Sequence, residues 1–432
     1  MSPRPLSRAV AAFLAGVRAL VEVLRRRARF PVLTEVLQHW LHEQRTIRQG
    51  VLALSIGIGI TLMAGIVLGA MDQLLEELPG LLVLAPAAIG MRGAIFGALG
   101  ARLGTGMLTG QLDGSVARRS FLGQNVEAAV VLSIVTGVVL AGAARLMGLV
   151  VGFETISFTD LVLVSMVGAV LSSLATLGVV LALTRFAERQ SWDMDAIGTP
   201  IVSAAADITT LPALIVGTLT LGNDTVSGVL GWSLVVLALA AAVLGLRSSA
   251  DTVRRVTRES LPILMYTAAM GILAGSVLEA RKETLITSVA LLVAVPPFIA
   301  SSGAIGGILS ARLSSQLHLG LLDPTAIPKR PAWLEGTLTV LFATVGYLAV
   351  GLLTAAAAGL LGYGGPGVVR LIGVTVTAGL LAVLMIFAVG YYAATASFRF
   401  GLDPDNVGIP LVTSTMDFVG ILCLTVGIVV IL

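Results

Sequence analysis

The sequence predicts an all-α polytopic membrane protein of eleven spans, built from two five-helix repeats of the same orientation and one extra transmembrane helix. Three observations predict this fold class. Of the 432 residues, 56% are hydrophobic and only 12% are charged, whereas about a quarter of the residues in soluble domains are charged. Apolar runs of about 20 residues, the length that a helix needs to cross a bilayer, recur along the chain. Finally, the two halves of the chain share sequence features at a constant offset.

The N-terminal segment, residues 1–48, is rich in arginine and only locally apolar. Its apolar side chains share one helical face, so we expect a basic amphipathic helix that lies on the cytoplasmic surface of the membrane. The residues of that face are Phe13, Val17, Leu20 and Leu24. A cleaved signal peptide is the alternative. It is disfavoured because Arg18 interrupts the apolar region and no small-residue cleavage site follows.

Eleven spans are expected in the rest of the chain. Leu, Ala, Val and Gly dominate them, which favours helices over the alternating strands of a membrane β-barrel. The expected spans are 50–70, 81–110, 124–144, 159–184, 198–221, 228–246, 259–279, 286–318, 334–361, 367–395 and 407–431. They divide the chain into a first repeat at 49–222, a connecting helix and loop at 223–258, and a second repeat at 259–432.

Basic residues orient these spans, because cytoplasmic loops carry an excess of Lys and Arg. With the N-terminus inside, the outer segments and span ends hold only Arg145, Arg281, Lys282 and Arg370. The other basic residues fall in the N-terminal segment or at the inner ends of spans. We therefore expect a multi-pass protein of the plasma or inner membrane, with a cytoplasmic N-terminus and an external C-terminus.

The two halves of the chain repeat each other at an offset of 210 residues. Asp417 lies 210 residues after Asp207, and the segments 86–110 ("PAAIGMRGAIFGALGARLGTGMLTG") and 296–320 ("PPFIASSGAIGGILSARLSSQLHLG") agree at 11 of 25 positions. Chance would give roughly two or three agreements in so apolar a composition. Five spans per repeat would invert the second copy, and the extra span at 228–246 restores its orientation. The repeats should therefore be related by a pseudo-two-fold axis along the membrane normal.

Asp207 and Asp417 are the candidate metal ligands. They stand in the apolar stretches "SAAADITTLP" and "STMDFVGILC", and an ionised Asp at the bilayer centre costs about 2.5–3.5 kcal/mol. Two facing carboxylates also repel each other, and a divalent cation between them removes both penalties. Mg²⁺ keeps several waters and needs only one or two carboxylates, so it suits this pair better than Ca²⁺. Capping a neighbouring helix or pairing with an arginine is the alternative role for each aspartate.

Other polar groups near the pair are candidates to line a path. Ser203 and Thr413 lie one helical turn before the aspartates, although helix packing would also explain them. Pro212 lacks an N–H, so the carbonyl of Ile208 loses its helical partner and could bind water or a cation. Asn406 is the fourth candidate. At the inner mouth, four further carboxylates either concentrate cations or cap the last helix of each repeat: Asp193, Asp195, Asp403 and Asp405.

Three segments resemble the membrane domain of the MgtE magnesium transporters: "APAAIGMRGAIFGALGARLGTGMLTGQL", "DMDAIGTPIVSAAADITT" and "DPDNVGIPLVTSTMDFVG". The two-copy, eleven-span arrangement is most similar to solute carrier family 41. The resemblance implies a five-span unit that works as a pair, with Asp207 and Asp417 lining the cation path from the last helix of each unit. Ala94 and Ala304 depart from the family, which usually has Asn at these positions.

The sequence therefore predicts a transporter of divalent cations, foremost magnesium, rather than an enzyme. Magnesium is the transported ion, and no cofactor is expected. Channel-like permeation and sodium- or proton-coupled exchange both stay open. An intramembrane aspartyl protease also uses two membrane aspartates, but its Tyr-Asp and Gly-x-Gly-Asp motifs are absent, because Ala206 and Met416 precede the aspartates. The expected partners are the cation and membrane lipid. The net charge of +3 is too small to suggest nucleic acid. A monomer suffices for a path, and an oligomer stays open.

Overall fold

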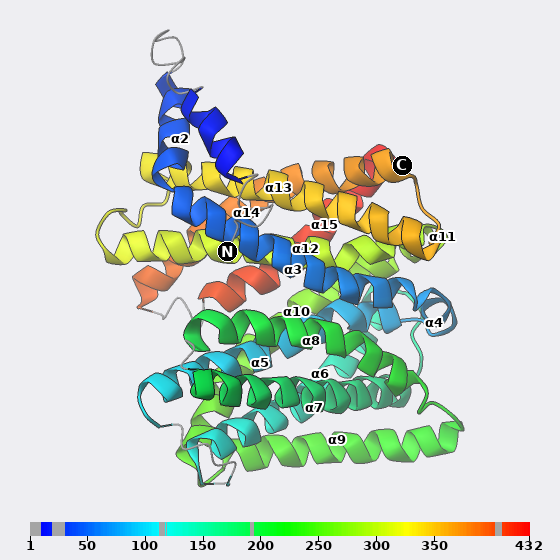
Figure 1. Ribbon diagram of the computed structural model, residues 1–432. Coiled ribbons are helices and arrows are strands. Elements are labelled where there is room, and N and C mark those ends of the chain that lie inside the picture. The colour runs from blue at the N-terminus through cyan, green and yellow to red at the C-terminus, as the bar shows by residue number, and fades with distance from the viewer. Residues whose placement is uncertain (1–9, 20–30, 112–116, 118, 191–193, 402–407) are drawn as a thin grey trace.

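The computed structural model describes residues 10–19, 31–111, 117, 119–190, 194–401 and 408–432 (Figure 1). Within these residues the protein contains helices and no strand. The long helices are α3 (Gln44–Gly69), α5 (Leu81–Leu108), α6 (Phe121–Val151), α7 (Phe158–Gln190), α8 (Met194–Thr218), α9 (Asp224–Leu246), α10 (Asp251–Glu279), α12 (Val289–His318), α13 (Arg330–Leu361), α14 (Val368–Phe400) and α15 (Ile409–Ile431).

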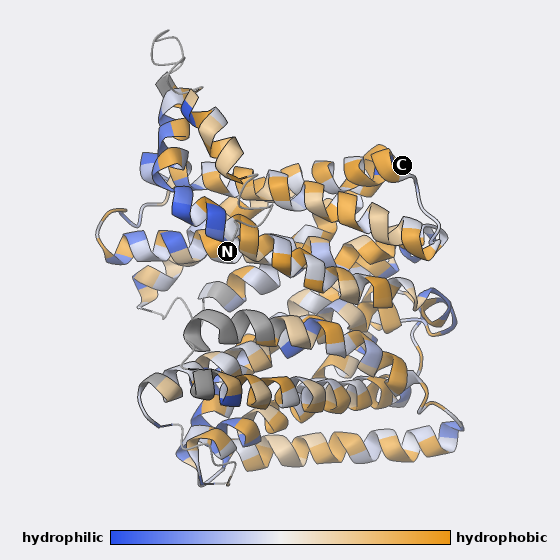
Figure 2. Cartoon of the chain, in the orientation of Figure 1, coloured by the Kyte–Doolittle hydropathy of each residue, from blue (hydrophilic) through white to orange (hydrophobic). Residues whose placement is uncertain are grey.

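These long helices confirm the predicted all-α polytopic membrane fold. Ten of them are long and apolar enough to cross a membrane. The eleventh, α8, has 25 residues, and its apolar part is described over Ala204–Thr218. Figure 2 shows apolar residues along the long helices, with hydrophilic residues gathered towards helix ends and on α2 (Pro31–His42).

The helices of the two halves correspond at the offset of 210 residues. Helices α7 and α14 begin and end at equivalent residues, and so do two short helices, α4 (Asp72–Glu77) and α11 (Lys282–Thr287). Gly110 and Gly320, after α5 and α12, both have a φ of 70°, which glycine adopts without a steric penalty. The correspondence thus extends to short helices and turns that hydropathy did not predict.

The central helices of the two halves are α5 and α12. In their most apolar windows, 72% and 83% of the residues are buried, against 22% in α9. Helix α9 has no counterpart and packs against α6, α7 and α10 at the periphery, at the bottom of Figure 1. Because α9 buries so little of its surface against the protein, we expect most of it to contact lipid.

The first helix of each half packs against the opposite half. Helix α3 contacts α12 and α13, whereas α10 contacts α5 and α6. A Cβ added at Gly65 of α3 would overlap the carbonyl oxygen of Val293, and one added at Gly275 of α10 would overlap that of Val83. Both members of the second contact lie 210 residues from those of the first, so the exchange of helices is reciprocal. The two halves are therefore interlocked.

The expected spans match the eleven long helices, and the main differences lie at helix ends. Helix α3 begins at Gln44 instead of residue 50, and α10 begins at Asp251 instead of residue 259. The first turns of these helices are polar, with the sequences "QRTIRQ" and "DTVRRVTRES". A hydropathy criterion leaves such turns out, although they continue the helix beyond the apolar segment.

The described part of the N-terminal segment contains the helix Val10–Ala19 followed by α2. Val17 is buried against Leu37 of α2, and the ring centroids of Phe13 and Trp40 lie 6.2 Å apart. Part of the apolar face that was expected to lie on lipid is therefore covered by α2. The other two residues of that predicted face, Leu20 and Leu24, lie outside the described residues.

Candidate functional site

Each predicted metal ligand lies in the last helix of its half. Asp207 of α8 and Asp417 of α15 are both partly buried. Helix α8 packs against α5, α7 and α3, and α15 packs against the equivalent helices of its own half, α12 and α14, and against α10. Because α3 and α10 are the exchanged helices, α8 and α15 border the interface between the halves.

The carboxylate of Asp417 reaches across this interface. A Cβ built on Gly90 of α5 would lie 3.2 Å from its Oδ2, so the carboxylate lies against the backbone of the first half. Asp207 lies within electrostatic range of Asp417. Among the described residues, neither aspartate forms an ion pair with a basic side chain. The fold thus brings together two carboxylates that form no ion pair with a described basic residue.

Two pairs of hydroxyl groups join α10 to α15 within one helical turn of Asp417, and Thr267 lies beside Gly90 together with the Asp417 carboxylate. The hydroxyls of Thr267 and Ser414 lie 2.9 Å apart, and those of Tyr266 and Thr415 lie 2.6 Å apart. Sequence reasoning missed the α10 residues, because their place beside α15 depends on how the helices of the two halves pack. Oxygen atoms of this kind are suited to a hard cation or to its bound waters.

The predicted path-lining residues differ in their surroundings. The hydroxyl of Thr413 donates to the carbonyl of Pro410 at 3.2 Å, and its Cβ lies 3.6 Å from the position of a Cβ built on Gly303. Thr413 therefore packs against α12 of its own half, which supports the packing role. Ile208 is 38% exposed, and α8 continues as a helix past Pro212.

The structure does not describe the side chains of the remaining predicted site residues. Asp193, Asp403, Asp405 and Asn406 lie outside the described residues. The backbones of Asp195 and Ser203 belong to α8, but the structure does not describe their side chains. Their proposed places at the mouth and along the path stay predictions.

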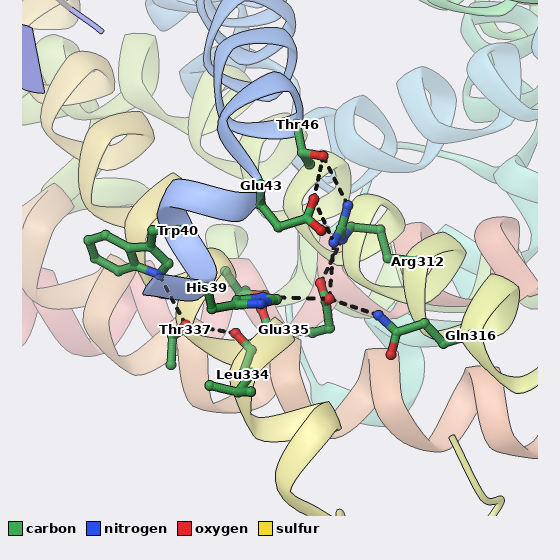
Figure 3. A network of polar contacts seen from close by, with 10 residues as sticks. His39, Trp40, Glu43, Thr46, Arg312, Gln316, Leu334, Glu335 and Thr337 are labelled. Atoms are coloured by element: carbon green, nitrogen blue, oxygen red, sulfur yellow. Dashed lines mark hydrogen bonds and ion pairs between the residues drawn. The ribbon is translucent and has the colours of Figure 1, made fainter. Parts of the chain in front are cut away.

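A second polar cluster joins α2 and α3 to α12 and α13 (Figure 3). Arg312 donates to both carboxylate oxygens of Glu335, at 2.6 and 3.0 Å, and lies 3.1 Å from Oε2 of Glu43. The Glu335 side chain is only 3% exposed, and Nε2 of His39 lies 3.6 Å from its Oε1. In the first half, Arg102 donates instead to the neutral Asn125, at 2.8 Å. The ion network is thus specific to the half that α2 contacts.

Glu43, just before α3, is the outermost carboxylate of this cluster. Burial raises the pKa of its carboxyl, but a 2.7 Å hydrogen bond from Thr46 and the charge of Arg312 outweigh burial and lower the pKa below its usual value. Glu43 therefore stays ionised near neutral pH and pairs with Arg312 at 3.1 Å.

Glu335→Gln should loosen the attachment of α2 to the second half. The change removes one buried partner of Arg312, which costs about 3 kcal/mol in comparable pairs. We expect a lower unfolding temperature and faster hydrogen exchange in α2. Lys329→Gln is the control, because its partner Asp323 is 70% exposed and their ion pair should contribute little. Equal exchange in the two variants would show that the cluster does not hold α2.

Comparison with protein families gives two matches to one family, MgtE, described as divalent cation transporter. They cover residues 85–217 and 295–426, together more than half of the chain. The matches begin 210 residues apart, and each contains one of the two aspartates. The family resemblance is thus repeated in both halves, in the register predicted from the internal repeat.

Two relatives match part of the chain. Solute carrier family 41 member 3 of Rattus norvegicus is 28% identical over 163 residues, which cover 37% of this chain and 35% of the relative. The same protein of Mus musculus is 27% identical over 163 residues, covering 37% and 33%. The match thus spans about a third of each relative, and no solved structure matches. On the evidence of the doubled family match, this chain belongs to the MgtE family of divalent cation transporters.

Proposed function

We propose that the protein carries Mg²⁺ across the cell membrane along a path between its two halves, and that Asp207 and Asp417 jointly hold the ion. Membership of a divalent cation transporter family supports the substrate class. The observation that carries the role of the aspartates is the position of Asp417, against Gly90 of the opposite half and within electrostatic range of Asp207.

Electrostatics supports a divalent ion as the occupant. Two ionised carboxylates close together in an apolar bundle repel each other and lose hydration, and no described basic side chain forms an ion pair with them. One divalent ion neutralises both. Mg²⁺ retains several waters. These waters can donate hydrogen bonds to the hydroxyl oxygens near Asp417. A bare Ca²⁺ would need about six to eight oxygen ligands, more than two carboxylates supply.

The topology proposed with this function follows the internal repeat. We assign 49–222 and 259–432 as the two repeats, 223–258 as the connecting helix and loop, and 1–48 as a cytoplasmic segment. The C-terminus is then external. Both aspartates belong to one chain, so a single chain supplies a complete path.

Uptake by proteoliposomes tests the proposal. Purified protein is reconstituted around a magnesium-sensitive dye, and Mg²⁺ is added outside. We expect saturable uptake above that of protein-free liposomes, with stronger inhibition by excess Mn²⁺ than by excess Ca²⁺. Repeating the assay with sodium and pH gradients separates channel-like permeation from coupled exchange, because only coupled exchange responds to those gradients at constant voltage. Folded protein that gives no Mg²⁺ flux under any gradient would contradict the proposal.

A further inference from the structure

The first half contains a buried cation that the proposed path does not use. Arg92 lies within α5 and is 1% exposed. Its Nη1 donates to Oγ of Ser173 at 2.8 Å, and its Nη2 donates to Oγ1 of Thr136 at 3.1 Å. Ser173 donates in turn to Ser133 at 2.9 Å. Among the described residues, no carboxylate lies within ion-pair distance of the guanidinium, so neutral hydroxyls are its polar partners.

The second half shows that this packing does not require an arginine. Ser302 occupies the position equivalent to Arg92, and its hydroxyl lies 2.8 Å from the hydroxyl of Tyr347. Tyr347 is 1% exposed and packs against Phe298, with ring centroids 4.7 Å apart. A neutral serine–tyrosine pair therefore fills the equivalent position in α12. A buried charge is costly in a membrane, so packing alone does not explain Arg92.

Arg92 lies on the side of α5 that faces away from Asp417. Gly90, which contacts Asp417, precedes Arg92 by two residues, and two residues rotate a helix by about 200°. Helix α5, which is about 10–12 Å across with its side chains, therefore separates the guanidinium from the carboxylate of Asp417, at a distance of about 10 Å or more. That distance excludes an ion pair, but the field of a unit charge remains strong there at low dielectric.

Polar contacts connect the surroundings of Arg92 with helix α8, which carries Asp207. Ser173, a partner of Arg92, lies one turn before Thr176 on α7. The hydroxyl of Thr176 lies 3.1 Å from that of Thr209, which follows Asp207 by two residues on α8. The charge of Arg92 thus lies beside the helices that carry one side of the path, with no described counter-ion between them.

We propose that Arg92 is a fixed counter-charge that sets how tightly the path holds its ion. Together with two ionised aspartates it leaves a net charge of −1 where the carboxylates alone would give −2. A divalent ion is then held less tightly and leaves sooner. Conduction needs this balance, because binding must favour entry and still permit release. This inference rests on the proposed function. Arg92 does not touch the ion. It acts at a distance, through the electric field of its guanidinium.

Arg92→Gln tests the inference by removing the charge while keeping a hydrogen-bond donor for Ser173 and Thr136. At about 10 Å and an effective dielectric of about 20, we expect the Mg²⁺ concentration at half-maximal uptake to fall about tenfold or more. The maximal rate should also fall, because release becomes slower. Arg92→Lys retains the charge and should restore values close to those of the parent.

A second pair of variants tests the charge of Arg92 without replacing the arginine. Ser173→Asp places a carboxylate beside Nη1 of Arg92 and should shift half-saturation in the same direction as Arg92→Gln. Ser173→Asn is the matched control, because it has nearly the same size but no charge. A purely structural role of Arg92 would not separate these two variants. Thermal unfolding in detergent verifies the fold of each variant. If Arg92→Gln does not fold, the comparison of Ser173→Asp with Ser173→Asn tests the inference instead.

The outcomes separate this inference from the proposed function. If folded Arg92→Gln or Ser173→Asp keeps the parent half-saturation, Arg92 is a packing residue and the inference is wrong. The double variant Asp207→Asn, Asp417→Asn is measured in parallel. Normal uptake by that double variant would overturn the proposed path itself. Loss of its uptake, together with unchanged Arg92 and Ser173 variants, would overturn the inference alone.

Discussion

Replacing both Asp207 and Asp417 with asparagine should abolish Mg²⁺ uptake, and either single replacement should slow it by about tenfold or more. Asparagine keeps the size of the side chain but removes one negative charge from a site where little solvent screens it. A single variant still offers one carboxylate to a hydrated ion, whereas the double variant offers none. The measurement is the initial rate of Mg²⁺ uptake into proteoliposomes at equal amounts of folded protein.

Carboxylates outside the membrane interior provide the controls for this experiment. Asp193→Asn and Asp403→Asn should do less harm, because we expect these residues at a solvated mouth where water and salt screen their charges. Asp160 lies in the first turn of α7, at the other end of this helix from the expected mouth, and accepts a hydrogen bond from Ser157. Asp160→Asn should leave uptake unchanged. Near-normal uptake by the double variant at Asp207 and Asp417 would place the cation path elsewhere.

Leucine at Gly65 or Gly275 should prevent the two halves from interlocking. Each glycine lies against a backbone carbonyl of the opposite half, so an added Cβ meets main chain that cannot rotate away. Overpacking a core costs about 1–3 kcal/mol, and we expect the upper end of this range or more here. The result should be a low yield of monodisperse protein and a markedly lower unfolding temperature.

Gly59→Leu is the matched control on α3. A Cβ at Gly59 would have no neighbour within 4 Å, so this variant adds the same side chain without the clash. If Gly65→Leu and Gly275→Leu match Gly59→Leu in yield and unfolding temperature, close packing of the exchanged helices is not needed for the fold.

Hydropathy and the internal repeat predict most of the fold, because spanning a bilayer requires long apolar helices and the repeat marks which of them are equivalent. The pairing of helices between halves is harder to predict. Hydropathy describes each helix alone, and small residues such as Gly65 and Gly275 indicate a close contact without naming the partner. Hydropathy does not predict short helices such as α4 and α11, because their polar sequences resemble loops.

The candidate site was predicted in part for the same reason. The offset of 210 residues identifies Asp207 and Asp417 as equivalent. Both stand in apolar helices where a carboxylate is costly, and this cost indicates a functional role. The position of Asp417 against Gly90, and the hydroxyl of Thr267 nearby, depend on the packing of α5, α10 and α15. Likewise, nothing in the sequence near Glu335 indicates that the N-terminal part of the chain brings His39 to Glu335 and Glu43 to Arg312.

Anomalous diffraction from crystals grown with Mn²⁺, used in place of Mg²⁺, locates the bound ion. We expect an anomalous peak between the carboxylates of Asp207 and Asp417, which decreases when Mg²⁺ is added and is absent from the double asparagine variant. A peak elsewhere in the membrane part of the protein, with no density between these two carboxylates, would contradict it.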